Sequence, residues 1–175
     1  MSQYRKLTLD ERSALENRGC HAENWDNVSV TLDFSVEQLR NVRFEGEIRI
    51  GSGSYISYST LRNYTIGNNC HIDSVLRMEC RHSSTFGEGV GVAAVNENGG
   101  RTATIYRDIT SQIAYIMTMM RNRKGAVEQL LKMATERAEE HRSDMGVVED
   151  GSTVMGARFI REVRIERGAV IEGAS

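Results

Sequence analysis

The fold is decided by the stretch Leu61-Arg-Asn-Tyr-Thr-Ile66-Gly-Asn-Asn-Cys-His-Ile72-Asp73, because its pattern returns twice elsewhere in the chain. Residues 39–51 and 160–172 align with it without gaps. Each passage holds an apolar residue, a second one five positions later, and a third six positions after that. A helix face would repeat at three and four, and a half-exposed antiparallel strand at two. Spacing near six predicts neither of these and indicates a stacked repeat.

The repeat is clearest when the chain is divided into hexads that begin with a large aliphatic residue. The second position is Gly, Asp or Glu in six of the eight hexads, and the fifth position is small in six of them. This pattern is typical of a left-handed parallel β-helix, where the aliphatic residue fills a triangular interior and the small residue points inward. With three hexads to a coil, residues 39–100 and 147–175 predict about five coils. The hexads begin at Ile50, Ile56, Ile66, Ile72, Val148, Val154, Ile165 and Ile171.

The segments on either side of the repeat have other signatures. Thr8 and Glu11 form a capping box and Gly19 suits a helix end, which predicts a short helix over about 9–18 within an N-terminal lead-in of residues 1–38. We expect Trp25 to pack on the first coil. We expect β-helix coils over 39–107 and 147–175, in one domain. The sequence stops inside a hexad, so we expect the coils to continue in a longer protein.

Residues 108–146 change period and predict an inserted antiparallel helical hairpin. Two apolar stripes at helical spacing flank Asn122-Arg-Lys-Gly125. The methionines Met117, Met119 and Met120 suit an adaptable contact surface, although core packing explains most of them equally well. Self-association is expected, as a trimer or a dimer, because an uncovered last coil would present unpaired backbone groups.

Composition excludes several classes of protein. The 175 residues carry a formal net charge of −2 with 39% apolar residues, so no general basic field is available for nucleic acid or an acidic membrane. No stretch approaches the apolar length of a membrane span or a signal peptide, and three cysteines at unrelated spacings suit reduced thiols. These features favour a cytoplasmic protein. Arginine far outnumbers lysine, which suits bidentate capture of phosphate or carboxylate as well as it suits a simple compositional bias.

On these hexads, the chain resembles hexapeptide-repeat left-handed β-helix proteins, a group dominated by acyltransferases and by the acetyltransferase halves of sugar nucleotidyltransferases. It is most similar to the N-terminal part of a family of longer bacterial β-helix proteins of unknown function. That resemblance extends from the Tyr4-Arg-Lys-Leu-Thr opening, through Gly19-Cys20 and Asn96-Glu-Asn-Gly-Gly-Arg101, to the last hexads. The hexads specify a fold much better than an activity.

The resemblance implies a histidine base that deprotonates an acceptor hydroxyl or amine. The candidates are His82, in a passage where the β pattern loosens, and His71, at an outward hexad position. Either histidine is as readily explained as solvated surface. His21 has no visible partner, and His141 suits a helix C-terminus.

The most site-like passage is the glycine-rich stretch from Phe86 to Arg101. Its donors, acceptors and single cation could hold an anionic ligand such as a sugar phosphate, through Asn96, Glu97, Gly99, Gly100 and Arg101. It lacks the spacing of a phosphate-binding loop, so a plain polar loop is the alternative. Cys70-His71 and Cys80-x-His82 lack the paired spacing of a structural zinc site, so we expect no metal site.

Two functions remain open from the sequence. One is an acyl or nucleotidyl transferase that acts on a sugar phosphate or similar small anion, with acetyl-CoA or a sugar nucleotide as cofactor. The other is a non-catalytic β-helix scaffold or oligomerisation module. Binding of these small molecules would favour the first function, and its absence would favour the second.

Overall fold

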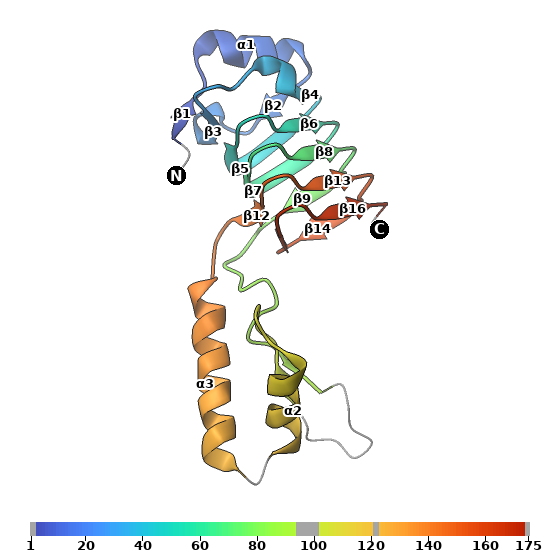
Figure 1. Ribbon diagram of the computed structural model, residues 1–175. Helices are drawn as coiled ribbons and strands as arrows, with labels where there is room; N and C mark the ends of the chain where they lie inside the picture. Colours follow the sequence, from blue (N-terminus) through green and yellow to red (C-terminus); the bar gives the residue numbers. More distant parts are fainter. Residues whose placement is uncertain (1–2, 94–101, 121–122, 174–175) are drawn as a thin grey trace. The chain divides into compact units, whose positions relative to one another are not determined.

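The computed structural model describes residues 3–93, 102–120 and 123–173, and the chain divides into two compact units (Figure 1). Unit 1 consists of Met1–Ser83 and Asp144–Ser175, and unit 2 of Ser84–Ser143. The chain is mainly β, with three α-helices among the described residues. The two units are described separately below.

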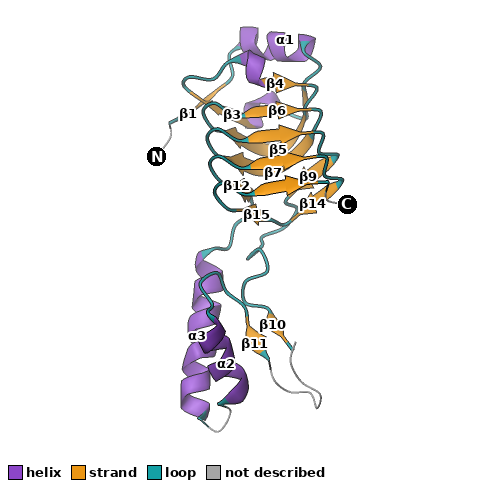
Figure 2. Cartoon of the chain, turned by 45° about the vertical axis from the view of Figure 1, so that its right-hand side comes forward, coloured by secondary structure: helices purple, strands orange, loops and turns teal. Residues whose placement is uncertain are grey.

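Unit 1 is built from short strands that pair mostly in parallel (Figure 2). One nine-stranded sheet follows the order β1-β3-β5-β7-β12-β15, with β2, β9 and β14 attached to it, and a five-stranded sheet follows β16-β13-β8-β6-β4. The strands are β1 (Tyr4–Lys6), β2 (His21–Ala22), β3 (Val28–Thr31), β4 (Leu39–Arg40), β5 (Arg43–Ile50), β6 (Tyr55–Ser57), β7 (Thr60–Ile66), β8 (His71–Asp73), β9 (Arg77–Glu79), β12 (Gly146–Val148), β13 (Thr153–Met155), β14 (Phe159–Arg161), β15 (Arg164–Ile165) and β16 (Val170–Glu172).

Successive passages of the chain stack in register, so that equivalent residues form inward columns. Ile50 lies opposite Ile66 of the next passage, and Leu61 lies opposite Met78. We call each such circuit of the chain a layer. The first residue of every hexad is buried, except the last one, Ile171, which is half-buried. The predicted burial of these residues is therefore confirmed for all but Ile171, and the inward columns are Phe44-Leu61-Met78-Ile160, Ile50-Ile66-Val148-Ile165 and Ile56-Ile72-Val154-Ile171.

Each layer changes direction at three corners, and residues with positive φ line up at each of them. One corner holds Asn41, Tyr58, Ser74, Gly156 and Gly173, with φ between 46° and 63°. The amide of each donates to the carbonyl before the equivalent residue of the preceding layer, as in Tyr58 N to Arg40 O at 3.0 Å. The left-handed conformation is favourable for Gly and tolerable for Asn, which explains why these residues recur at the corners.

The layers are shorter than three full hexads, and this changes which small residue points inward. The hexads that begin at Ile72 and Val154 placed Leu76 and Arg158 at the inward fifth position. The structure instead buries Val75 and Ala157, one position earlier, while Leu76 is 58% exposed. A layer that falls short of three hexads turns its corner sooner, which moves the inward position.

The insert leaves and re-enters unit 1 at matching positions. Ile66 of β7 pairs with Val148 of β12, and Ile72 of β8 pairs with Val154 of β13, so both pairs bridge the insert at the same sequence separation. The layers before and after the insert therefore stack directly on one another. At the base of the insert, Ser84 and Ser143 exchange backbone hydrogen bonds of 2.9 and 3.0 Å.

The first layers begin earlier than the sequence pattern indicated, because β3 already pairs in parallel with β5. The predicted N-terminal helix is α1 (Leu9–Asn17), with the Thr8–Glu11 capping box formed. Trp25 lies edge-on to Phe44 at a centroid distance of 6.3 Å, as expected. Two 3-10 helices, Trp25–Asn27 and Val36–Gln38, complete this segment.

Unit 2 contains the predicted helical hairpin, α2 (Ser111–Met119) and α3 (Lys124–Glu140), together with β10 (Gly91–Val92) and β11 (Ala103–Thr104). Residues 84–107, expected to continue the coils, lie in this unit, and β10 and β11 pair antiparallel. Met117 is buried with Tyr106 and Ala134, so it belongs to the hairpin core rather than to a contact surface. His141 caps α3 and its Nδ1 lies 2.9 Å from Glu88. Among the described helices, none combines the length and apolar character needed to cross a bilayer.

Candidate functional site

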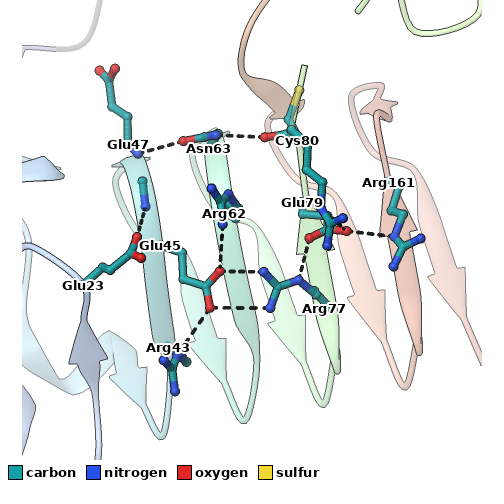
Figure 3. Close-up of polar contacts among 12 residues, drawn as sticks. Glu23, Arg43, Glu45, Glu47, Arg62, Asn63, Arg77, Glu79, Cys80 and Arg161 are labelled. Atoms are coloured by element: carbon teal, nitrogen blue, oxygen red, sulfur yellow. Dashed lines mark hydrogen bonds and ion pairs between the residues drawn. The ribbon is translucent and has the colours of Figure 1, made fainter. Parts of the chain in front are cut away.

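A column of alternating charge crosses four parallel strands of unit 1 (Figure 3). Glu45 of β5 lies opposite Arg62 of β7, Arg62 opposite Glu79 of β9, and Glu79 opposite Arg161 of β14. These residues are next to the inward column of Phe44, Leu61, Met78 and Ile160, so their side chains point outward. Neighbours in such a column are about 5 Å apart, and alternating signs make every neighbouring pair attractive.

Glu79 is the most buried member of the column, with a side chain that is 0% exposed. Its Oε2 accepts a 2.5 Å hydrogen bond from Arg77 Nε. Its Oε1 lies 3.0 Å from Arg81 Nε and 2.8 Å from Arg161 Nε, at ion-pair distance but outside hydrogen-bonding geometry. A fully covered carboxylate is tolerable here because three guanidinium groups surround it.

Glu45 forms a second carboxylate centre two layers away, on β5. Arg77 Nη2 donates to Glu45 Oε2 at 2.5 Å, while Arg43 Nε lies 3.3 Å from Oε1 and Arg62 Nη1 lies 3.5 Å from Oε2. Arg77 therefore bridges the two glutamates with opposite edges of one guanidinium. We call Arg43, Arg62, Arg77, Arg81 and Arg161, with Glu45 and Glu79, the arginine face.

Both carboxylates stay ionised because their arginines outweigh burial. Desolvation alone would raise the pKa of Glu79, but the hydrogen bond from Arg77 and the nearby Arg81 hold it below its usual value. The pKa of Glu45 is lowered in the same way, against desolvation, by the hydrogen bond from Arg77 and the charge of Arg43. The arginine face thus keeps its fixed charges at neutral pH.

Three of the arginines that lie at ion-pair distance from these carboxylates remain largely exposed. The side chains of Arg43, Arg81 and Arg161 are 69%, 50% and 55% exposed, and each contacts a glutamate through Nε. The terminal nitrogens of a guanidinium form the edge that binds phosphate or carboxylate in bidentate fashion. The Nε of Arg62 is buried without a hydrogen-bond acceptor among the described residues.

Two further carboxylates bound this face. Glu23 Oε2 accepts a hydrogen bond from the Gly46 amide at 3.3 Å. Glu162 accepts from the Arg81 amide at 2.8 Å and from Cys80 Sγ at 3.0 Å. Desolvation followed by this contact with Glu162 raises the pKa of the Cys80 thiol to about 12, which keeps it protonated. The arginine face itself holds five guanidinium groups around two carboxylates.

A groove at the neighbouring corner adjoins the arginine face. It has a volume of about 330 Å³, and Tyr58, Leu76, His21, Arg43 and Thr60 are among its lining residues. His21 pairs in register with Arg43, and Arg43 with Thr60. Arg43 therefore belongs both to the groove and to the arginine face.

A larger hollow of about 430 Å³, lined partly by Glu149 and Asp150, lies elsewhere in unit 1. Its carboxylates are engaged within the protein, Glu149 with Arg164 at 2.5 Å and Asp150 with the Asn68 amide at 2.7 Å.

The histidines predicted from the sequence lie on different sides of unit 1. His82 is exposed and follows β9, one residue after Arg81. His71 is exposed at the start of β8, in the five-stranded sheet. The structure thus places His82 beside the arginine face and His71 on another sheet.

The other predicted ligand residues, Asn96, Glu97, Gly99, Gly100 and Arg101, lie outside the described residues. Within residues 3–93, 102–120 and 123–173, no three His, Cys, Asp or Glu side chains are grouped as metal ligands. The sequence interpretation did not predict the arginine face, nor that His21 lines the groove beside Arg43. Only the equal spacing of Glu45, Arg62 and Glu79 along the chain could have indicated the column.

Comparison with known protein families identifies the family to which the chain belongs. The family described as a domain of unknown function (DUF4954) matches residues 4–58 and 52–175. The chain belongs to this family. A protein of similar sequence is an uncharacterised protein of Treponema pallidum (strain Nichols), 22% identical over 213 residues. That match covers 98% of this chain but only 29% of the relative, so the chain spans less than a third of that protein's length. No solved structure matches the chain.

Proposed function

We propose that unit 1 of this DUF4954 chain is a left-handed parallel β-helix of hexapeptide repeats. The proposal is supported by the stacked parallel strands, the buried first positions of the hexads, and the three corners of positive φ. Such a stack holds outward side chains in straight columns, because each layer repeats the backbone of the one before it. A rigid platform of this kind suits the fixed presentation of charged groups.

On this platform, we propose that the arginine face binds a small anion that carries a phosphate or carboxylate group. The observation that carries the proposal is that Arg43, Arg81 and Arg161 each approach a glutamate through Nε, while their side chains remain 69%, 50% and 55% exposed. Side chains fixed in this way lose little conformational entropy when a ligand binds. A sugar phosphate or a sugar nucleotide has the required chemistry, and so does the pyrophosphate of acetyl-CoA.

The reaction class we propose for such a ligand is acyl or nucleotidyl transfer, with His82 as the candidate base. His82 is one residue from Arg81, so an acceptor hydroxyl or amine near the imidazole would lie close to an anion on the face. Its neutral imidazole would accept the proton that the acceptor loses when the new bond forms. His71, on the five-stranded sheet, and Asn96, Glu97, Gly99, Gly100 and Arg101 remain alternative site residues of this proposal.

Isothermal titration with inorganic phosphate, glucose 1-phosphate, UDP-N-acetylglucosamine and acetyl-CoA tests the binding. The variant Arg81→Gln/Arg161→Gln removes two exposed guanidinium groups and should weaken binding at least tenfold. The matched control is Arg49→Gln, since Arg49 is similarly exposed and pairs with Glu47 on the other half of β5. Absence of binding at millimolar concentration, or an equal loss in the control, would refute the proposal.

A second candidate function is a non-catalytic scaffold or oligomerisation module. Each of β14, β15 and β16 has one strand partner among the described residues, namely β9, β12 and β13. Their opposite edges can pair with a further layer, supplied by a longer chain or by another copy in a dimer or trimer. Light scattering across a hundredfold concentration range tests self-association, and a constant monomeric mass would exclude it for this chain.

A further inference from the structure

We infer that the corner groove beside the arginine face receives the ring of an aromatic anion, whose charged group lies on the arginine face. This inference rests on the proposed anion-binding function and specifies its ligand class: a planar aromatic group joined to a phosphate or carboxylate. The argument depends on Tyr58, Leu76 and Arg43.

Tyr58 is an unusual residue for its position in the fold. Its φ is +46°, whereas the equivalent residues of the neighbouring layers are Asn41 and Ser74, followed by Gly156. A bulky side chain in the left-handed region is strained, and such strain persists mainly where a site needs it. Tyr58 nevertheless remains 51% exposed, so burial in the core does not compensate for the strain.

The ring of Tyr58 is held in place rather than left free. The guanidinium carbon of Arg40 lies 5.8 Å from the ring centroid, a cation–π geometry. In the groove, Leu76 adds a second apolar side chain that is 58% exposed. Leu76 points outward because Val75, one residue earlier, fills the interior. Single exposed apolar residues are normal on a protein surface, but two that line the same groove indicate a binding site.

Charge complementarity selects an anion as the occupant. Arg43 lines the groove and contacts Glu45 at 3.3 Å, so it connects the apolar wall to the arginine face. His21 and Thr60 add an imidazole and a hydroxyl to the lining of the same groove. A ligand with its ring on Tyr58 and its anionic group on Arg43 would contact the apolar wall by aromatic stacking. It would contact the arginine face by bidentate hydrogen bonds.

A ligand series separates this inference from the function on which it rests. Inorganic phosphate and glucose 1-phosphate report on the arginine face alone. Phenyl phosphate and benzoate add the same benzene ring with different anionic groups, and AMP adds a larger purine ring. We expect phenyl phosphate to bind at least tenfold more tightly than inorganic phosphate, and comparison with benzoate and AMP identifies the anionic group and the ring size. The uncharged phenol should not bind measurably at the same concentration.

The variant Tyr58→Asn removes the ring and keeps a residue that tolerates positive φ. It should abolish the advantage of phenyl phosphate to within threefold, leave phosphate affinity unchanged, and keep or raise the melting temperature. Leu76→Ser should reduce the same advantage, and Tyr55→Asn is the control, because Tyr55 is 55% exposed on β6, outside this groove.

The outcomes are distinct. Binding of phosphate without any gain from an aromatic ring overturns the inference and leaves the proposed function standing. A gain that survives both Tyr58→Asn and Leu76→Ser also overturns it. Failure of every anion to bind refutes the proposed function and this inference with it.

Discussion

Replacement of Glu79 by glutamine should destabilise unit 1 strongly, because it removes the charge that three arginines share. The Glu79 side chain is fully covered, and its partners Arg77, Arg81 and Arg161 are 25%, 50% and 55% exposed. Breaking a fully buried ion pair costs about 3–5 kcal/mol. Water can reach these arginines in part, so the expected loss of unfolding free energy is about 2–3 kcal/mol. That loss lowers the unfolding midpoint by roughly 5–10 °C.

The measurement can be made specific to unit 1. Trp25 is the single tryptophan of the chain and packs on Phe44, so its fluorescence reports on this unit. The matched control is Glu47→Gln, because Glu47 is 51% exposed and pairs with Arg49 at 2.6 Å. An exposed pair of this kind contributes about 0–1 kcal/mol. If the Trp25 transition of Glu79→Gln shifts no more than that of Glu47→Gln, the buried-carboxylate argument is wrong.

Three further predictions test the fold. Ile66→Asp should unfold unit 1, since it places an unpaired charge in the closed interior, whereas Thr65→Asp, one residue away and outward, should keep the β signal in circular dichroism. The pKa of Glu11 is lowered to about 2, mainly by the hydrogen bond from Arg5. Up to about 3 kcal/mol of stability should therefore be present above pH 4.5 and lost as the pH falls towards 2. Glu11→Gln should flatten this pH dependence of the unfolding midpoint measured by Trp25 fluorescence. Replacing residues 84–143 by a short Gly-Ser linker should preserve the unfolding transition of Trp25, because β7 and β12 pair across the insert. An unfolded product would contradict this prediction. A fall in mass to that of a monomer would show that the hairpin mediates assembly.

The interior of unit 1 could be predicted from sequence because it is a closed apolar space. Every layer must supply a large aliphatic residue at each side, so Ile50, Ile66 and Val148 recur wherever the chain passes. The capping box of Thr8 and Glu11 was equally predictable, since both of its partners lie within one helical turn. Contacts of short sequence range and positions of fixed burial leave a pattern in the sequence.

The corners could not be predicted from the same period. A strict hexad repeat implies three full hexads to a layer, whereas the pairings of Ile50 with Ile66 and of Leu61 with Met78 show shorter layers. The difference arises at the corners, where Asn41, Tyr58 and Ser74 adopt positive φ and bend the chain sooner. Leu76 is outward for this reason, although the strict hexad count placed it inside. Backbone conformation at a corner depends on the layer beneath it, which no local pattern encodes.

The arginine face could not be predicted from the sequence. Its members meet only when two strand registers are correct, the one between the layers before the insert and the one between β9 and β14 after it. Glu45, Arg62 and Glu79 follow one another at a constant spacing, but Arg161 joins the column only after the insert. A slip of one residue at re-entry would turn Arg161 into the apolar interior and Ile160 outward. Correct closure of the face therefore requires the β9–β14 pairing, and the buried charge of Glu79 in turn favours the register that delivers Arg161 to it. The same contact that anchors the proposed anion site thus helps to specify how the chain resumes its stack after the interruption by Ser84–Ser143.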